Sequence, residues 1–321
     1  MVTAIPDIVA DVGGTNARFA LVHPGTTDVF NTDTLQVRDF GTITDAFRLY
    51  MKKQGLSEAV RACVALAGPV EGDQLQLTNG NWAFSKETTR AELRFERLLF
   101  INDFKAQAAA IPYLKDDQLV MLGGRAAIDG RSRVIIGPGT GLGVAGAVAT
   151  GDGYVIVEGE GGHIGLSPTS DREIAVHEKL LQRYGRVSAE RIICGPGLRN
   201  LYRILQELDG VAAVERTEAQ VVAEAVNGES EICREALDIF LAYLGAVAGD
   251  LALTFGAFGG VYIAGGIVPR VRDHVKGSQF RSRFEAKGRM AHLVRDIPTY
   301  LVMSQDAGLI GAAACLKEVR A

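Results

Sequence analysis

The stretch Ile8-Val9-Ala10-Asp11-Val12-Gly13-Gly14-Thr15-Asn16-Ala17-Arg18-Phe19-Ala20-Leu21-Val22 places glycines and polar residues between two short apolar runs. Short apolar runs rich in β-branched residues on both sides of a glycine turn are typical of paired strands. The pattern therefore predicts a β-hairpin. Successive backbone N–H groups in such a turn can bind phosphate oxygens, and the missing side chains let those oxygens approach. The simpler alternative is that the glycines only allow the chain to turn.

A second stretch near the middle of the chain repeats this design. Val134-Ile135-Ile136 is followed by Gly137-Pro138-Gly139-Thr140-Gly141-Leu142-Gly143, and then by the apolar run 144–148. Both stretches contain a Gly-Thr step, Gly14-Thr15 and Gly139-Thr140, which indicates a duplicated architecture. A third glycine pair, Gly265-Gly266, follows a short apolar run at 261–264. We expect the two hairpins to face each other across a cleft and to hold a polyphosphate between them.

The side chains near these turns fit the same interpretation. Thr15 and Thr140 would add hydroxyl donors to the two turns. Asp11 would be an acceptor able to hold Mg²⁺, through water because that ion dehydrates reluctantly. The residues that we predict to bind the nucleotide are Ala10, Asp11, Val12, Gly13, Gly14, Thr15, Asn16, Gly139, Thr140, Gly141, Gly265 and Gly266.

Two common nucleotide motifs are not supported. The sequence contains no Gly-x-x-x-x-Gly-Lys-Ser/Thr, so a P-loop is not expected. Gly141-Leu142-Gly143-Val144-Ala145-Gly146 matches the dinucleotide pattern GxGxxG, but that pattern must open a helix. The residues from Val144 to Val148 instead read as a strand, and Gly151-Asp152-Gly153 as a turn.

Two further stretches carry groups suited to a polyol. Asn102-Asp103 stands between an apolar run and an Ala-rich helix, where ordinary helix capping is the simpler interpretation. A carboxylate held there could also act as a general base, with the Asn102 amide binding a hydroxyl. Glu158-Gly159-Glu160-Gly161-Gly162-His163-Ile164-Gly165 sets two acids and a histidine in a glycine loop. A loop histidine is usually structural, and the spacing does not favour zinc.

Composition limits the remaining possibilities. The chain has 321 residues, of which 47% are hydrophobic and 22% are charged. It contains 38 glycines. This composition predicts a folded chain of one large or two ordinary domains. A net charge of −4 gives no attraction for nucleic acid or membrane. The basic stretch 270–289 reads as a solvated helical face, with a phosphate-binding patch as the alternative.

The remaining sequence features indicate a cytoplasmic protein. The four cysteines are scattered and suit buried thiols in a reducing compartment. The first residues do not resemble a signal peptide, since Asp7 and Asp11 precede the first basic residue, Arg18. The uncharged stretch Leu251–Pro269 is interrupted by glycines, so we expect the core of a second domain and no membrane span.

Taken in order, the motifs resemble those of the bacterial ATP-dependent glucokinases of the actin-like sugar kinase superfamily. The stretches that carry the resemblance are 11–18, Asn102-Asp103, 137–143, 160–163, Ser188-Ala189-Glu190-Arg191 and 264–269, supported by 67–70, 78–82, 194–202 and 306–311. Relatives often have glycine at the position of Ala10, a difference from which we expect little effect. A related repressor and kinase family continues into a cysteine-rich zinc loop, and 166–170 has no cysteine.

The resemblance implies an α/β, two-domain, actin-like (ribonuclease H-like) fold with its active site in the interdomain cleft. Residues 1–112 would form a small domain, completed by a helix within 305–321, and residues 113–304 a large one. Glucose would bind Asn102, Asp103, Glu160, His163 and Glu190. ATP phosphates and Mg²⁺ would lie against the hairpins, and Asp103 would be the catalytic base. The family is generally a cytoplasmic homodimer.

Two alternatives stay open from the sequence. The protein could phosphorylate another hexose, such as fructose or mannose, or use polyphosphate in place of ATP. It could also be a non-catalytic sugar sensor on the same fold, since a fold does not determine a function. The presence of Asp11 and Asp103, and an early first strand that leaves no expected room for a DNA-binding module, favour the enzyme.

Overall fold

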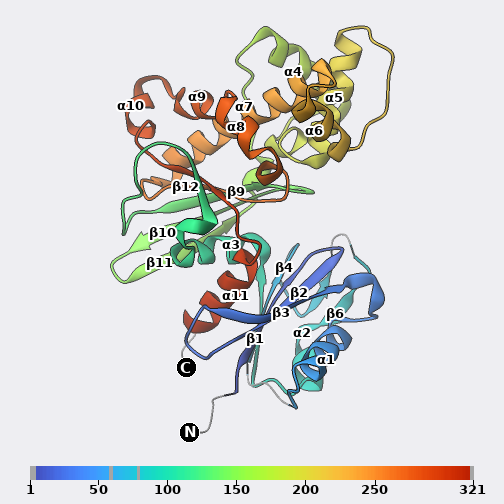
Figure 1. Cartoon of the computed structure of the whole chain (residues 1–321), viewed down its shortest axis with the longest axis vertical. Coiled ribbons are helices and arrows are strands. Elements are labelled where there is room, and N and C mark those ends of the chain that lie inside the picture. The colour runs from blue at the N-terminus through green and yellow to red at the C-terminus, as the bar shows by residue number, and fades with distance from the viewer. Residues whose placement is uncertain (1–4, 58–60, 78–79, 319–321) are drawn as a thin grey trace. The chain divides into compact units, whose positions relative to one another are not determined.

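A computed structural model describes residues 5–57, 61–77 and 80–318. The chain divides into two compact units, each built around its own sheet (Figure 1). Unit 1 comprises Met1–Lys115 and Ser304–Ala321, and unit 2 comprises Asp116–Met303. The last segment of the chain therefore returns to the unit in which the chain begins.

Unit 1 is built on a five-stranded sheet in the order β3-β2-β1-β4-β7. Its strands are β1 (Asp7–Val12), β2 (Asn16–Val22), β3 (Val29–Gln36), β4 (Arg61–Leu66) and β7 (Arg97–Asn102). β1 pairs antiparallel with β2 and parallel with β4, and β4 pairs parallel with β7. A separate two-stranded sheet joins β5 (Gln74–Gln76) to β6 (Ala83–Ser85). The sequence 75–78 also predicts a strand, and its last residue, Thr78, lies outside the described residues.

The helices of unit 1 bury different faces of its large sheet. They are α1 (Ile43–Lys53), α2 (Lys86–Glu92), α3 (Asp103–Ala110) and α11 (Ala307–Glu318). Ile8, Ala10 and Val12 of β1 join the core cluster that contains α1, where Phe19 contacts Phe47 edge-on at 5.0 Å between ring centroids. Alternate strand residues point to opposite faces, so Asp11 points away from this cluster. That orientation places its carboxylate beside α11.

Unit 2 is built on a six-stranded sheet in the order β11-β10-β9-β12-β13-β8. Its strands are β8 (Leu119–Gly123), β9 (Arg133–Pro138), β10 (Leu142–Thr150), β11 (Gly153–Gly159), β12 (Val261–Ile263) and β13 (Thr299–Val302). From β11 to β13 the pairings run antiparallel, antiparallel, parallel, parallel, as they do from β3 to β7 in unit 1. The duplicated architecture predicted from the two Gly-Thr steps is confirmed. The strand predicted within the GxGxxG match is also confirmed, as β10.

A long helix forms the centre of the helical part of unit 2. The helices are α4 (Asp171–Tyr184), α5 (Gly195–Leu208), α6 (Glu218–Asn227), α7 (Glu231–Phe255), α8 (Arg272–Gly277), α9 (Phe280–Glu285) and α10 (Ala291–Val294). Among the described residues, α7 alone is long and apolar enough to cross a membrane. Most of that segment is buried within the unit, which accounts for its apolar character. Leu251–Pro269 contains the end of α7 and strand β12, as expected for core.

The basic stretch 270–289 corrects one prediction in part. We expected its charges to lie on a solvated face, and Arg270, Arg272, Lys276 and Arg289 are exposed. The side chains of Arg281, Arg283 and Lys287, however, are only 18%, 13% and 9% exposed. Arg283 binds both carboxylate oxygens of Glu173 in α4, at 2.6 and 3.2 Å. Arg281 donates to the backbone carbonyl oxygens of Ile297 and Arg295 at 2.9 and 2.7 Å. These cations join elements of unit 2, because short helices leave many carbonyl groups that need donors.

Candidate active site

The β1–β2 turn of unit 1 is held from several sides. Gly13 N–H donates to the Asn16 carbonyl at 2.9 Å, which closes the turn. The Thr15 carbonyl accepts from Val37 N–H at 2.9 Å, and the Val12 carbonyl accepts from Ala67 N–H at 3.0 Å. Gly13 and Gly14 stay partly exposed, and Thr15 and Asn16 are exposed. The predicted hairpin is confirmed, and its tip offers backbone groups at the surface of unit 1.

The Asp11 carboxylate lies against the first turn of α11. A Cβ added to Gly308 would stand 2.4 Å from Asp11 Oδ2, so only glycine allows this approach. Burial, the larger cause, and the Asp103 carboxylate together raise the pKa of Asp11 to about 6, although Arg18 opposes the rise. Arg18 also donates to Asp306 Oδ1 at 2.6 Å and to the Gln305 carbonyl, just before α11. Arg18 thus fastens the start of α11 beside the hairpin.

Asn102 and Asp103 occupy the junction between β7 and α3. The Asn102 Oδ1 atom accepts from Phe104 N–H at 2.9 Å and from Lys105 N–H at 3.3 Å, so Asn102 caps α3. The capping role considered from the sequence is therefore real. The Asp103 Oδ1 atom accepts from Phe104 N–H at 3.0 Å, which fixes this carboxylate at the helix start. Val12 pairs with Leu66, and Leu66 with Asn102, so β1 and β7 end at the same edge of the sheet and bring both predicted acids there. The Asp103 carboxylate accordingly contributes to the raised pKa of Asp11.

The acids of unit 1 suit a cation that arrives with its own ligands. No group of three or more His, Cys, Asp or Glu side chains able to hold a metal occurs among the described residues. Mg²⁺ bound to ATP needs only one or two protein carboxylates, because phosphates and water supply its other ligands. Asp11 would be such a ligand, and a cation beside it would offset the burial and the Asp103 charge that together raise its pKa. The donor set therefore fits Mg²⁺.

Replacing Asp11 with asparagine should stabilise the ligand-free protein at pH 8 by about 3 kcal/mol. The folded-state pKa of Asp11, about 6, lies above its ordinary value of 3.8, so the folded state binds more protons than the unfolded state between these values. Stability linked to Asp11 is thus present at low pH and is lost as the pH rises through about 6. Urea unfolding at pH 8 and pH 5 would measure the difference.

The increase in unfolding free energy caused by Asp11→Asn should be smaller at pH 5, because much of the Asp11 carboxyl in the wild-type protein is protonated there. Asp152→Asn is the matched control, because Asp152 is exposed in the turn between β10 and β11. Equal unfolding free energies for wild type and Asp11→Asn at pH 8 would contradict the burial of a charged Asp11.

The β9–β10 turn of unit 2 is the counterpart of the β1–β2 turn. Gly139 N–H donates to the Gly141 carbonyl at 2.8 Å, and the Gly139 carbonyl accepts from Gly195 N–H at 2.9 Å. Thr140 is exposed at the tip. Gly265 follows β12 with φ +85°, and a Cβ there would stand 2.3 Å from the Pro138 carbonyl oxygen. The predicted nucleotide-binding glycines of this unit are therefore neighbours at one end of its sheet.

The three predicted sugar ligands of unit 2 come from two short 3₁₀ helices. His163 is the last residue of η4 (Gly161–His163), and Glu160 directly precedes that helix. Glu190 belongs to η5 (Ala189–Arg191). A bridge between Gly165 and Ser188, with Ala189 N–H donating to the Ile164 carbonyl at 2.8 Å, joins the two segments. Glu160 and His163 are exposed, and Glu190 is partly buried. Unit 2 thus gathers these residues beside its hairpin.

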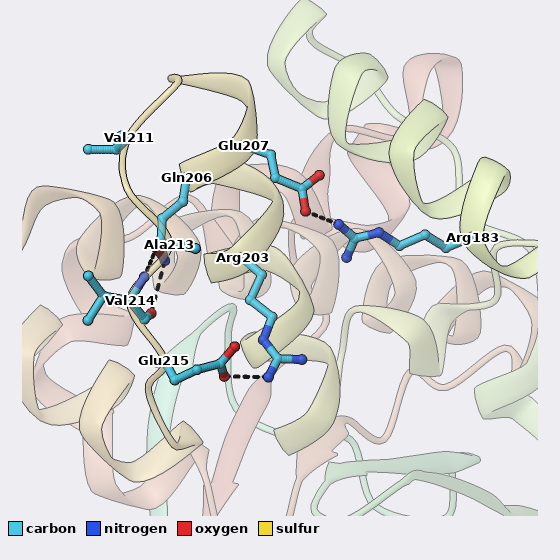
Figure 2. A pocket seen from close by; sticks show the side chains of 8 residues that line it. All are labelled: Arg183, Arg203, Gln206, Glu207, Val211, Ala213, Val214 and Glu215. Atoms are coloured by element: carbon cyan, nitrogen blue, oxygen red, sulfur yellow. Dashed lines mark hydrogen bonds and ion pairs between the residues drawn. The ribbon is translucent and has the colours of Figure 1, made fainter.

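A separate hollow of about 340 Å³ lies elsewhere on unit 2 (Figure 2). Its lining residues are Arg183, Arg203, Gln206, Glu207, Val211, Ala213, Val214 and Glu215. The arginines pair with glutamates, Arg183 with Glu207 and Arg203 with Glu215, and the Gln206 amide bonds the backbone of Val214. None of the predicted site residues lines this hollow. Its polar groups satisfy one another, so it is not the candidate active site.

Comparison with known proteins decides the family. The family model described as Glucokinase matches residues 8–319, nearly the whole chain. The chain belongs to the glucokinase family. A glucokinase from Neisseria meningitidis is 44% identical over 311 residues, which are 97% of this chain and 94% of that protein. The family and the enzyme class expected from the motifs are confirmed.

Solved structures confirm the fold. A glucokinase from an Antarctic psychrotroph has a TM-score of 0.90 and 38% identity, covering 98% of this chain and 99% of that chain. A ROK family glucokinase from Streptomyces griseus, solved with glucose and AMPPNP, has a TM-score of 0.64 and 18% identity, covering 98% and 99%. The α/β fold of this glucokinase family member is therefore that of the actin-like sugar kinases. As a kinase, the family implies ATP as a substrate.

The sequence patterns assigned no role to several residues that shape the candidate site of each unit. The Arg18 guanidinium, Asp306 and Gly308 position α11 against Asp11. Arg18 and Asp306 are separated by 288 residues, so no local pattern could pair them. Two contacts that hold the unit 2 hairpin were likewise not foreseen: Gly195 N–H donates to the Gly139 carbonyl, and Leu142 N–H donates to Glu190 Oε2 at 2.9 Å. An unusual glycine at a helix start, as at Gly308, is the signal that could have indicated a close approach.

Proposed function

We propose that the protein transfers the γ-phosphate of ATP to the 6-hydroxyl of D-glucose. The observation that carries this proposal is the matching pair of Gly-Thr hairpins on duplicated sheets, with the acids Asp11 and Asp103 beside the hairpin of unit 1. Paired backbone turns suit a polyphosphate, and a fixed carboxylate suits a hydroxyl nucleophile. Family membership supports the same reaction.

Phosphoryl transfer depends on alignment and on the neutralisation of charge more than on covalent chemistry by the protein. In the proposed reaction, Asp103 accepts the proton of the attacking hydroxyl, and its carboxylate is held in place by Phe104 N–H at 3.0 Å. The backbone groups of both hairpins bind the phosphates, with Gly265 and Gly266 near the adenosine. When bound, Mg²⁺ would neutralise phosphate charge beside Asp11. Asn102 orients the sugar from unit 1.

The sugar ligands proposed from unit 2 are Glu160, His163 and Glu190. Carboxylates accept hydrogen bonds from vicinal hydroxyls, and an imidazole can donate or accept one. Because η4 and η5 are joined through the Gly165–Ser188 bridge, the three side chains would act on one sugar as a unit. Their arrangement should favour glucose over its epimers and over fructose.

A coupled assay of ADP formation over a panel of sugars and phosphoryl donors tests this proposal. We expect Mg·ATP with glucose to give the highest kcat/KM. A higher kcat/KM with fructose or mannose would show that glucose is not the preferred substrate. Activity with polyphosphate but not with ATP would show that polyphosphate is the phosphoryl donor. Glucose binding without any phosphoryl transfer would instead favour the sugar sensor.

We further propose that the protein is a cytoplasmic homodimer, on the strength of its resemblance to the family. The described cysteines, Cys63, Cys194, Cys233 and Cys315, are all buried free thiols, which suits a reducing compartment. Light scattering coupled to size-exclusion chromatography would measure the oligomeric state, and a mass of one chain would contradict the dimer.

A further inference from the structure

We propose that Glu190 is a positioning residue for the β9–β10 hairpin, so that one carboxylate both binds the sugar and fixes the turn that binds the ATP phosphates. This inference rests on the proposed function for the identity of the two ligands. The contact itself lies entirely within unit 2. It joins two predicted sites that the sequence treats as independent.

The bond between Glu190 and the hairpin is direct. The Glu190 Oε2 atom accepts from Leu142 N–H at 2.9 Å, and Leu142 is the first residue of β10. Leu142 is buried and Glu190 is partly buried, so water competes little for this N–H. A hydrogen bond from a backbone N–H to a carboxylate is stronger than one between neutral groups. Glu190 thus fixes the strand at the point where it leaves the phosphate turn.

The same segment holds the other side of the turn. Gly195 N–H donates to the Gly139 carbonyl at 2.9 Å, at the start of α5. Cys194 connects the two contacts, because its Sγ donates to the Glu190 carbonyl at 2.8 Å and accepts from Gly197 N–H at 3.3 Å. Residues 190–195 therefore form hydrogen bonds to both ends of the turn, at Gly139 and at Leu142. A displacement of η5 would move the turn with it.

Gly141 is shaped to admit the Glu190 carboxylate. A Cβ at Gly141 would stand 2.7 Å from Glu190 Oε2, nearer than a side-chain carbon can approach. The φ angle of Gly141 is not positive, so backbone conformation does not explain the glycine here. The absent side chain instead explains how the carboxylate reaches Leu142 N–H.

Glu190 has a second oxygen for the sugar. In the described part of the chain, its Oε1 atom accepts no hydrogen bond, and η5 is joined to the η4 segment that carries His163. A hydroxyl bound to Oε1 would restrict the carboxylate while Oε2 still holds Leu142. Coupling of this kind is reciprocal, so sugar and nucleotide should each raise the affinity for the other.

The test measures nucleotide binding in the absence of sugar. If Glu190 only bound the sugar, its replacement would not change the affinity for nucleotide under these conditions. Isothermal titration of the full chain with Mg·ADP would compare Glu190→Ala, Glu190→Gln and His163→Ala. We expect Glu190→Ala to raise the Kd for ADP by about fivefold to tenfold, because the turn loses a charge-assisted bond. Glu190→Gln keeps an oxygen that can accept from Leu142 N–H and should stay within about threefold of wild type. His163→Ala should leave the Kd unchanged.

Three results would overturn the inference: an unchanged Kd for ADP in Glu190→Ala, a defect in Glu190→Gln as large as that in Glu190→Ala, or an equal defect in His163→Ala. This test can be told apart from the test of the proposed function. If the wild-type protein did not phosphorylate glucose, the proposed function would fail, but the comparison of ADP affinities among the variants would still be valid. Circular dichroism would confirm that each variant is folded.

A second variant tests the contact from its other side. Gly141→Ala should displace the Glu190 carboxylate and raise the Kd for ADP, whereas Gly151→Ala, whose Cβ meets no atom within 4 Å, should not. Because both changes break one contact, Gly141→Ala with Glu190→Ala should weaken binding by less than the product of the single effects. Fully multiplicative effects would show that the two residues act independently and would overturn the inference.

Discussion

Replacing Asp103 with asparagine should lower kcat for glucose phosphorylation by about 10²–10⁴-fold, the usual contribution of a positioned general base. Asparagine keeps the shape and one acceptor oxygen but cannot take the proton of the 6-hydroxyl. The Phe104 N–H bond at 3.0 Å can be kept by the amide oxygen, so the start of α3 should be preserved. The KM for glucose should change much less. Steady-state kinetics with Mg·ATP at saturation would measure both.

Glu160→Gln is the contrasting variant. Glu160 is exposed beside η4 and is proposed only to bind sugar hydroxyls, so its loss should raise the KM for glucose and weaken discrimination against epimers. Both proteins need a thermal melt to show that they are folded. Near-normal kcat in Asp103→Asn, together with lost kcat and unchanged glucose binding in Glu160→Gln, would reverse the two assignments.

Gly311→Ala should destabilise unit 1 by about 2–3 kcal/mol, because it overpacks a close helix crossing. A Cβ at Gly311 in α11 would stand 1.7 Å from the Ala106 carbonyl oxygen in α3. Backbone atoms cannot rotate out of the way, so the two helices must separate. Their contacts with β1 and β4 would loosen as a result. Urea unfolding followed by circular dichroism should show a lower midpoint with the same amplitude.

Gly277→Ala in α8 is the matched control. Its added Cβ meets no atom within 4 Å, and alanine is the better helix former, so its stability should equal or slightly exceed that of wild type. An unfolding midpoint for Gly311→Ala equal to that of Gly277→Ala would contradict the close crossing of α3 and α11.

Much of the fold followed from local patterns. The apolar patterns of 43–53 and 61–66 predict a helix and a strand, and these coincide with α1 and β4. The strands β3, β8, β11 and β13 were not foreseen. β11 contains the apolar run Tyr154-Val155-Ile156-Val157, which is a strand signal that was passed over. In the structure this strand pairs with β10 at the sheet edge.

The error at Arg281, Arg283 and Lys287, within the stretch 270–289, has a different cause. Charge alone suggested solvent, but Arg283 is paired with the nearly buried Glu173, which lies 110 residues earlier. A buried charge requires a partner, and no local pattern reveals a partner that distant. The chemistry of the candidate site was more accessible, because glycine turns and the Asn102-Asp103 junction are local. The tertiary contacts that orient these groups, such as that of Glu190 with Leu142, were not.

The return of the chain to unit 1 also has a consequence for synthesis on the ribosome. Unit 2 is one continuous segment, Asp116–Met303, whereas the sheet of unit 1 is covered by α11 from the last part of the chain. Leu309, Ala312 and Leu316 of α11 are buried, so β1 and β4 keep an apolar face exposed until that helix emerges. The segment translated first is therefore completed last. A nascent chain must wait for about 200 further residues, at about 5–20 residues per second, before this face is covered.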